Sequence, residues 1–259
     1  MGLFDFKTEE KVGLALGGGA TLGAAHVGVL RALEESEIKI DCIAGTSIGA
    51  MVGAFYAFGM SVDEIEKIAL ELDWPDISRI ALSRRGLLTN DEMGKRLDKY
   101  LGDVNFDEAD IPFAAVTTDI STGEKVILDE GDVSEAVKAS TCIPVLFEPI
   151  EYDGRLLVDG GLKESVPLSA IQSLGAEYTI GVDLNAHRNY ERPDNILDIL
   201  SNTLEIALKH LANVNTNEID LLIQPNLAEF SRSETKDTDK MIERGYQAAK
   251  DLLKEAQIK

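Results

Sequence analysis

Cysteine, histidine and basic residues are scarce in this sequence. Only two of its 259 residues are cysteines, Cys42 and Cys142, which excludes a disulfide framework. No cysteine, histidine and acidic cluster has metal-ligand spacing, so we expect no metal and no cofactor. Lys and Arg number 25 against 46 Asp and Glu, giving a net charge of −21. This charge argues against nucleic acid as a partner and against electrostatic attachment to anionic membranes.

Long uninterrupted apolar runs are also missing. Two stretches without charge, 12–30 and 42–62, are rich in glycine and contain Ser, Thr or His, so each predicts a buried strand, turn and helix rather than a membrane span. The N-terminal residues lack the basic start and apolar core of a signal peptide. We therefore expect a cytoplasmic protein, with transient contact to a membrane surface left open. The sequence does not determine the oligomeric state.

Strand-like and helix-like patterns alternate along the chain, and hydrophobic residues make up 44% of it. We predict one α/β domain over residues 1–259, with three layers and a mainly parallel central sheet covered by helices on both faces. Its core spans about 12–183, and an extension spans about 184–259. The predicted strands are Val12–Leu16, Cys42–Ala44, Phe113–Asp119, Glu124–Leu128, Leu156–Val158, Tyr178–Asp183 and Leu221–Pro225. Helices are predicted at Ala24–Glu35, 50–57, Ile196–Asn213 and about Lys236–Ala256.

A serine framed by glycines follows the second predicted strand, in the run Gly45-Thr46-Ser47-Ile48-Gly49. Gly45 and Gly49 allow a sharp strand-to-helix turn that exposes the Ser47 hydroxyl, as in a nucleophile elbow. The helix after the turn directs its free N–H groups and positive dipole end at any oxyanion formed there. The alternative is a structural turn that needs only small residues.

A glycine run follows the first predicted strand, Gly17-Gly18-Gly19-Ala20-Thr21-Leu22-Gly23. Consecutive glycines can turn successive N–H groups toward one anion. A dinucleotide site fits poorly, because Ala20 replaces the middle glycine of that fingerprint and no acidic residue ends the next strand. The Gly-Lys-Ser/Thr ending of a P-loop is also absent. The run therefore favours an oxyanion hole, which an acyl-transfer site combines with a serine elbow.

A third motif, Asp159-Gly160-Gly161, follows the predicted strand at 156–158. Taken alone, Asp-Gly is a common turn signal. Beside a serine elbow and a glycine loop, the Asp159 carboxylate is a candidate base for Ser47.

Together these three motifs resemble the patatin-like phospholipase family in order and spacing. The similarity extends from about 12 to 183 and includes the segments 24–30, 140–149 and 153–167. The resemblance implies a Ser–Asp dyad and lipid acyl hydrolysis, with Ser47 as nucleophile and Asp159 as base. It also implies an oxyanion hole built from Gly17, Gly18 and Gly19, joined by the N–H of Ile48. The glycines at 45, 49, 160 and 161 would support these motifs.

Two positions depart from the family pattern. Leu22 occupies the place where the glycine loop usually carries Arg or Lys. Lys163-Glu164-Ser165 precedes Val166-Pro167, where relatives often have Asn. The first departure removes a positive charge near the oxyanion loop, and the second bears on the local loop structure.

A Ser-His-Asp triad is the competing mechanism, and the sequence has three histidines that could take part in it. His26 lies among small apolar residues of a predicted helix, which is typical of a packed structural histidine. His187 follows Asp159 in the order of an α/β-hydrolase, but the elbow of such enzymes usually comes much later in the chain. His210 lies in a predicted helix, as a surface or boundary residue. The dyad therefore remains the favoured interpretation.

The segment Trp74–Thr89 mixes apolar residues with Arg79, Arg84 and Arg85 in an otherwise acidic chain. Its simplest interpretation is an amphipathic helix that ends at Gly86, and the alternative is a lid that meets lipid. The sequence thus predicts a serine lipid acyl hydrolase or esterase whose partner is a lipid or another acyl ester. An acyltransferase using the same site, and a catalytically silent lipid- or nucleotide-binding protein, remain alternatives.

Overall fold

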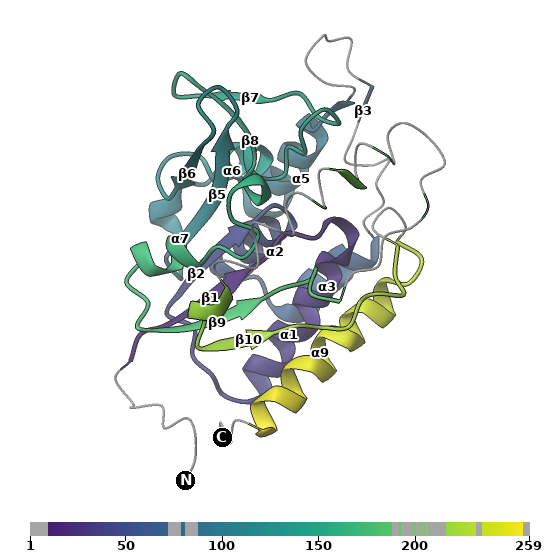
Figure 1. Cartoon of the computed structure of the whole chain (residues 1–259). Coiled ribbons are helices and arrows are strands. Elements are labelled where there is room, and N and C mark those ends of the chain that lie inside the picture. Colours follow the sequence, from purple (N-terminus) through teal and green to yellow (C-terminus); the bar gives the residue numbers. More distant parts are fainter. Residues whose placement is uncertain are drawn as a thin grey trace.

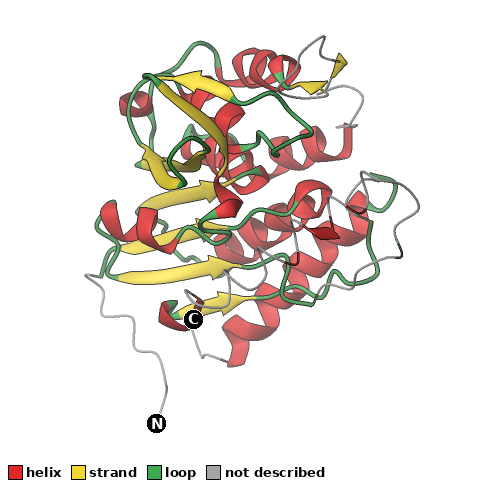
Figure 2. Cartoon of the chain, turned by 45° about the horizontal axis from the view of Figure 1, so that its top comes forward, coloured by secondary structure: helices red, strands yellow, loops and turns green. Residues whose placement is uncertain are grey.

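The computed structural model describes residues 10–71, 79–80, 88–187, 192, 199, 202–203, 206, 216–231 and 235–255. Its centre is a mixed, mostly parallel sheet with helices packed on both faces, as Figures 1 and 2 show. The strand order is β10 (Leu221–Ile223), β9 (Tyr178–Val182), β1 (Val12–Leu16), β2 (Cys42–Thr46), β5 (Phe113–Asp119), β8 (Arg155–Asp159) and β7 (Ile150–Tyr152). The α/β class predicted from the sequence is confirmed.

Parallel pairing runs from β10 through β9, β1 and β2 to β5. The strands β6 (Glu124–Leu128), β8 and β7 add antiparallel pairs at the β5 side of the sheet. Strands β1, β2, β5 and β9 are buried throughout their length, as expected for strands covered on both faces.

Two buried apolar clusters hold the layers together. The larger one lies between the sheet and the helices α1 (Ala24–Glu35), α2 (Ile48–Ala57), α3 (Val62–Glu71), α5 (Asp91–Leu101), α6 (Val133–Ser140) and α9 (Thr238–Glu255). The smaller one lies under α7 (Leu168–Ser173), on the opposite face of β1, β2 and β5. Short 3₁₀ turns lie at Ala20–Gly23, Phe106–Glu108, Gly160–Leu162 and Thr216–Glu218.

Helices α1 and α9 lie side by side with their backbones in close approach (Figure 1). A Cβ added to Gly28 would lie 1.9 Å from the Ile242 carbonyl oxygen, and one added to Gly245 would lie 1.9 Å from that of Ala25. Glycine is required at both positions because any side chain would push the helices apart. The C-terminal helix is thus held against the helix that follows the glycine loop.

Most predicted elements match the observed ones within two residues. The two strands over 113–119 and 124–128 and the helix over 24–35 have the predicted bounds. The second and fifth predicted strands are longer than expected, at 42–46 and 155–159, because neighbouring strands extend their pairing. The predicted helix over 196–213 lies largely outside the described residues.

Candidate active site

Ser47 occupies the sharp turn between β2 and α2. Its φ of 55° and ψ of −126° are strained for a residue with a side chain, and strain of this kind is concentrated at functional sites. The turn is held by the Ser140 hydroxyl, which accepts from the Ser47 N–H at 2.8 Å and donates to the Val116 carbonyl at 2.7 Å. A Cβ at Gly45 or Gly49 would clash with backbone atoms at 2.1–2.3 Å, so both positions of the motif require glycine. The chain therefore makes a sharp, strained strand-to-helix turn at Ser47.

Asp159 ends β8 at a point that strand register brings close to Ser47. Strand β6 pairs with residues 115–119 of β5 and therefore occupies one edge of that strand. On the opposite edge β2 pairs with residues 113–116 and β8 with residues 117–119, so β2 and β8 meet end to end. Thr46, just before Ser47, faces Val116, whereas Asp159 faces Thr117, the next residue along β5. This is one residue step, ~3.4 Å along the strand.

Further contacts hold Asp159 in that place. Its N–H donates to the Cys142 carbonyl at 2.8 Å, two residues beyond the Ser140 that holds the elbow. Its Oδ1 accepts from the Gly161 N–H at 2.8 Å, which fixes the carboxylate against the following turn. A Cβ at Gly160 would lie 2.2 Å from the Val116 carbonyl oxygen, so this glycine lets the two strand ends meet.

The glycine loop contacts the elbow directly. A Cβ on Gly18 would lie 3.3 Å from the Ser47 Cβ. The N–H groups of Gly17 and Gly18 donate to the carbonyls of Val182 and Ser165, at 3.0 Å each. In this conformation those two N–H groups are therefore engaged with the protein. The N–H of Ala20, which the sequence analysis did not place in the oxyanion hole, makes no hydrogen bond among the described residues.

The carbonyls of the glycine loop are each held by a donor. His26 Nε2 donates to the Gly17 carbonyl at 2.7 Å, and Asn185 Nδ2 donates to the Gly18 carbonyl at 2.8 Å. The Leu22 N–H donates to the Gly19 carbonyl at 3.2 Å. His26 is fully buried, and burial lowers its pKa from 6.5 to about 4, so the ring is neutral near pH 7. His26 thus has the structural place that its helix pattern indicated.

Next to Ser47 an apolar pocket opens, with about 880 Å³ of empty space when the solvent at its mouth is included. Its walls come from the glycine loop, from α1, α2, α3, α5 and α9, and from the loop after α6. Among the described residues that line it, none is charged. The apolar lining residues include Val27, Ile48, Met51, Val52, Phe55, Ile65, Ile68, Met93, Ile143 and Phe147.

The pocket follows one face of α2. From Ser47 to Phe55 this helix rises ~12 Å, since each residue contributes 1.5 Å. With C–C bonds of about 1.5 Å in a zigzag, roughly nine methylenes of an extended chain match that length. The apolar lining and this length therefore suit a hydrocarbon chain beside the serine.

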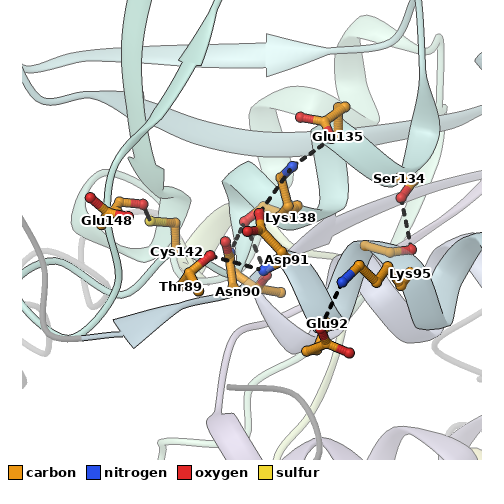
Figure 3. A network of polar contacts seen from close by, with 12 residues as sticks. Thr89, Asn90, Asp91, Glu92, Lys95, Ser134, Glu135, Lys138, Cys142 and Glu148 are labelled. Atoms are coloured by element: carbon orange, nitrogen blue, oxygen red, sulfur yellow. Dashed lines mark hydrogen bonds and ion pairs between the residues drawn. The ribbon is translucent and has the colours of Figure 1, made fainter. Parts of the chain in front are cut away.

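A polar network supports the pocket wall between α5 and α6 (Figure 3). Asn90, which is 2% exposed and lines the pocket, donates through Nδ2 to the Lys138 carbonyl at 2.7 Å. The Lys138 ammonium forms ion pairs with Glu135 at 2.5 Å and with Asp91 at 3.9 Å. Nearby, the Cys142 thiol donates to the Glu148 carbonyl at 2.8 Å, and burial raises the pKa of this thiol to about 12. Cys142 is therefore a structural thiol.

Both departures from the family pattern have a structural account. Leu22 is 2% exposed and belongs to the main apolar core. Glu164 is also buried, where it accepts from the Ser169 N–H at 2.9 Å and from Lys125 Nζ at 3.1 Å. Its carbonyl accepts from the Thr46 hydroxyl at 2.9 Å. The loop after Asp159 is thus tied to the elbow.

Only part of the segment 74–89 lies among the described residues. There, β3 (Arg79–Ile80) pairs antiparallel with β4 (Leu88–Thr89), so the prediction of an amphipathic helix is wrong for these residues. Main-chain bonds explain the difference: the Leu88 N–H donates to the Leu146 carbonyl at 2.8 Å, and the Glu148 N–H donates to that of Leu88 at 3.0 Å. This tertiary pairing overrides the helical periodicity.

The other two histidines do not support a triad. His187 is exposed and is not among the residues lining the pocket. His210 lies outside the described residues. Among the described residues no helix is both long and apolar enough to cross a membrane, and no group of three or more metal-ligating side chains occurs.

Comparison with known proteins identifies the family to which this chain belongs. A sequence model of the patatin-like phospholipases matches residues 14–171, and the chain belongs to that family. An NTE family protein of Mycobacterium tuberculosis is 38% identical over 181 residues, covering 69% of this chain and 50% of that protein. A protein named lysophospholipase NTE1 from Pyricularia oryzae is 34% identical over 191 residues, covering 68% of this chain and 12% of that protein.

Solved structures show the same fold. The structure of VipD from Legionella pneumophila aligns with a TM-score of 0.67 and 16% identity, covering 95% of this chain and 67% of VipD. The type III effector ExoU aligns with a TM-score of 0.52 and 14% identity, over 96% of this chain and 54% of ExoU. The chain spans half or less of the length of the two relatives described above.

Proposed function

We propose that this protein is a serine hydrolase that cleaves the ester bond of lipids carrying one acyl chain, such as lysophospholipids, with Ser47 as nucleophile and Asp159 as base. The observation that carries the proposal is the strained Ser47 in the wall of a pocket whose described lining residues are uncharged and mostly apolar. Relatives named lysophospholipases support the choice of substrate. A pocket suited to one acyl chain supports it too, since the polar head group would then remain outside.

The dyad is supported by the meeting of β2 and β8 on one edge of β5. Asp159 lies one strand step from the residue before Ser47, and the short segment from Ser140 to Cys142 holds the main chain of both. A carboxylate is a weak base for a serine hydroxyl unless it is held within hydrogen-bond reach. The bond from the Gly161 N–H supports this role, because it fixes the orientation of the Asp159 carboxylate.

The reaction follows from these positions. Asp159 takes the hydroxyl proton as Ser47 Oγ attacks the ester carbonyl carbon, and the carbonyl oxygen becomes an oxyanion. N–H groups of the glycine loop and of Ile48 stabilise that charge. The C–O bond to the leaving alcohol breaks as the alcohol takes the proton from Asp159, leaving an acyl-serine. Water, deprotonated by the same carboxylate, releases the fatty acid and restores Ser47.

The test is covalent labelling with an alkyl fluorophosphonate, with the adduct located by mass spectrometry. We expect labelling at Ser47, none in Ser47→Ala, and labelling about 100-fold slower in Asp159→Asn, within the range for a lost acid–base group. Asp153→Asn is the matched control, because this exposed aspartate lies in the turn that enters β8. Absent labelling in the wild type, with and without lipid, would refute the proposal.

Product analysis with a lysophospholipid and an added alcohol separates hydrolysis from acyl transfer. Free fatty acid as the main product supports a hydrolase, whereas a new ester identifies an acyltransferase. Nucleotide binding finds little support, because the described part of the pocket lining has no charged residue and the Gly17 and Gly18 N–H groups are already engaged.

A further inference from the structure

The glycine loop has no conformational preference of its own that would aim its N–H groups at Ser47. Glycine peptides reorient at little steric cost, and a reversed peptide would direct a carbonyl oxygen at the developing oxyanion. Something outside the loop must therefore select the orientation. The described contacts of the Gly18–Gly19 peptide identify one side chain that does so, Asn185.

Asn185 lies just after β9 and donates through Nδ2 to the Gly18 carbonyl at 2.8 Å. Its own N–H donates to the Asp183 carboxylate at 2.9 Å, which fixes the turn that carries it. The amide orientation is set by chemistry, because only the nitrogen can donate to a carbonyl. Its Oδ1 is buried without a hydrogen-bond partner among the described residues. Such a group is costly, so the contact with Gly18 is maintained against a penalty.

The planarity of the peptide bond transmits this contact. In a trans peptide the C=O and the N–H point in opposite directions, so holding the Gly18 carbonyl also fixes the direction of the Gly19 N–H. Asn185 is not among the residues lining the pocket, whereas Ala20 and Ser47 are. Because Asn185 holds the Gly18 carbonyl, the Gly19 N–H of the same peptide points away from Asn185. His26 holds the preceding carbonyl, Gly17, in a similar way.

We infer that Asn185 is a positioning residue for the oxyanion hole: its amide holds the Gly18 carbonyl so that the Gly19 N–H is aimed at the oxyanion. This inference rests on the proposed hydrolase function. Asn185 itself touches neither substrate nor Ser47 in this role. It acts on charge that develops only in the transition state, so its removal affects kcat rather than substrate binding.

The experiment compares wild type, Asn185→Leu, Asn185→Asp and the control Asn226→Leu, which removes an exposed asparagine. A soluble ester gives kcat and KM. An alkyl trifluoromethyl ketone, which forms an oxyanion on the serine, gives an affinity that depends on the hole. We expect both Asn185 variants to lose roughly 100-fold in kcat and in ketone affinity, near the loss of one oxyanion donor, with KM within about twofold. The control should match wild type in all three.

Three results would overturn the role of Asn185 or the proposed function. Wild-type labelling at Ser47 with unchanged kcat and ketone affinity in Asn185→Leu would overturn this inference alone. Parallel loss of kcat, ketone affinity, substrate binding and thermal stability would also overturn it, because a merely structural role predicts that pattern. A wild-type protein without labelling at Ser47 would overturn the proposed function and this inference with it.

Discussion

His26 makes folding stability depend on pH in a calculable way. The fully buried ring donates from Nε2 to the Gly17 carbonyl, and its Nδ1 has no hydrogen-bond partner among the described residues. Burial lowers the pKa of the folded protein's His26 to about 4, against 6.5 for an exposed histidine, and the bond to Gly17 offsets only part of that change. The unfolded chain therefore binds this proton first as the pH falls.

The direction and size of this pH dependence of stability follow from the difference in proton binding between the folded and unfolded protein. Well above pH 6.5 His26 is neutral in both the folded and the unfolded protein, so it does not change the free energy of unfolding. Below pH 6.5 His26 becomes protonated in the unfolded chain but stays neutral in the folded protein. The free energy of unfolding therefore falls until the pH reaches about 4, where the folded protein binds the proton too. The loss approaches about 3 kcal/mol in total and is about 2 kcal/mol between pH 7.5 and pH 5.

The assay is urea unfolding followed by circular dichroism at pH 7.5 and pH 5, on wild type and His26→Gln. Glutamine can place an N–H near the position of the histidine Nε2 and does not titrate. Other acidic groups affect both proteins, so the difference between the two losses isolates His26. We expect wild type to lose about 2 kcal/mol more than the variant. Equal losses in the two proteins would refute the buried, neutral histidine.

Three further outcomes follow from the packing. Ser140→Ala leaves the Ser47 N–H without its partner and should cost about 1–3 kcal/mol of stability, measured by urea unfolding, together with a slower fluorophosphonate reaction. Gly28→Ala should lower the free energy of unfolding by about 2–3 kcal/mol, because its Cβ would meet the backbone of α9. Gly94→Ala, with room for a Cβ in α5, should raise it by up to about 1 kcal/mol. Leu22→Arg should destabilise by about 3 kcal/mol or more without raising activity, since it buries an unpaired charge in the core; higher kcat in a folded variant would contradict this.

The sequence predicted the sheet well because its central strands are short apolar runs bounded by glycine or polar turns. The run 12–16 is an example: a buried parallel strand reads as continuous hydrophobicity, and the prediction needed no tertiary information. The elbow was predictable for a similar reason, since Gly45 and Gly49 are demanded by local geometry. The spacing of glycines around Ser47 reports a backbone constraint that any chain with this turn must meet.

Contacts between distant segments could not be predicted in this way. Ser140 lies 93 residues from the serine whose N–H it accepts, and Asn185 lies 167 residues from the glycine it holds. No periodicity or spacing encodes such pairs. The pairing of Leu88 with the loop at 146–148 was missed for the same reason, because a tertiary partner determines its conformation.

The family match ends at residue 171, yet the candidate site does not. The Gly17 N–H donates to the Val182 carbonyl, and Asn185 holds the next residue of the loop. Thr235 and Thr238 also line the pocket, and Thr238 is the first residue of α9, whose backbone closely approaches α1 at Gly28. Ser47 and Asp159 lie within residues 14–171, whereas Asn185 and the two threonines of the pocket lining lie beyond them. Differences in chain preference between this protein and its relatives should therefore map to the C-terminal segment rather than to the shared motifs.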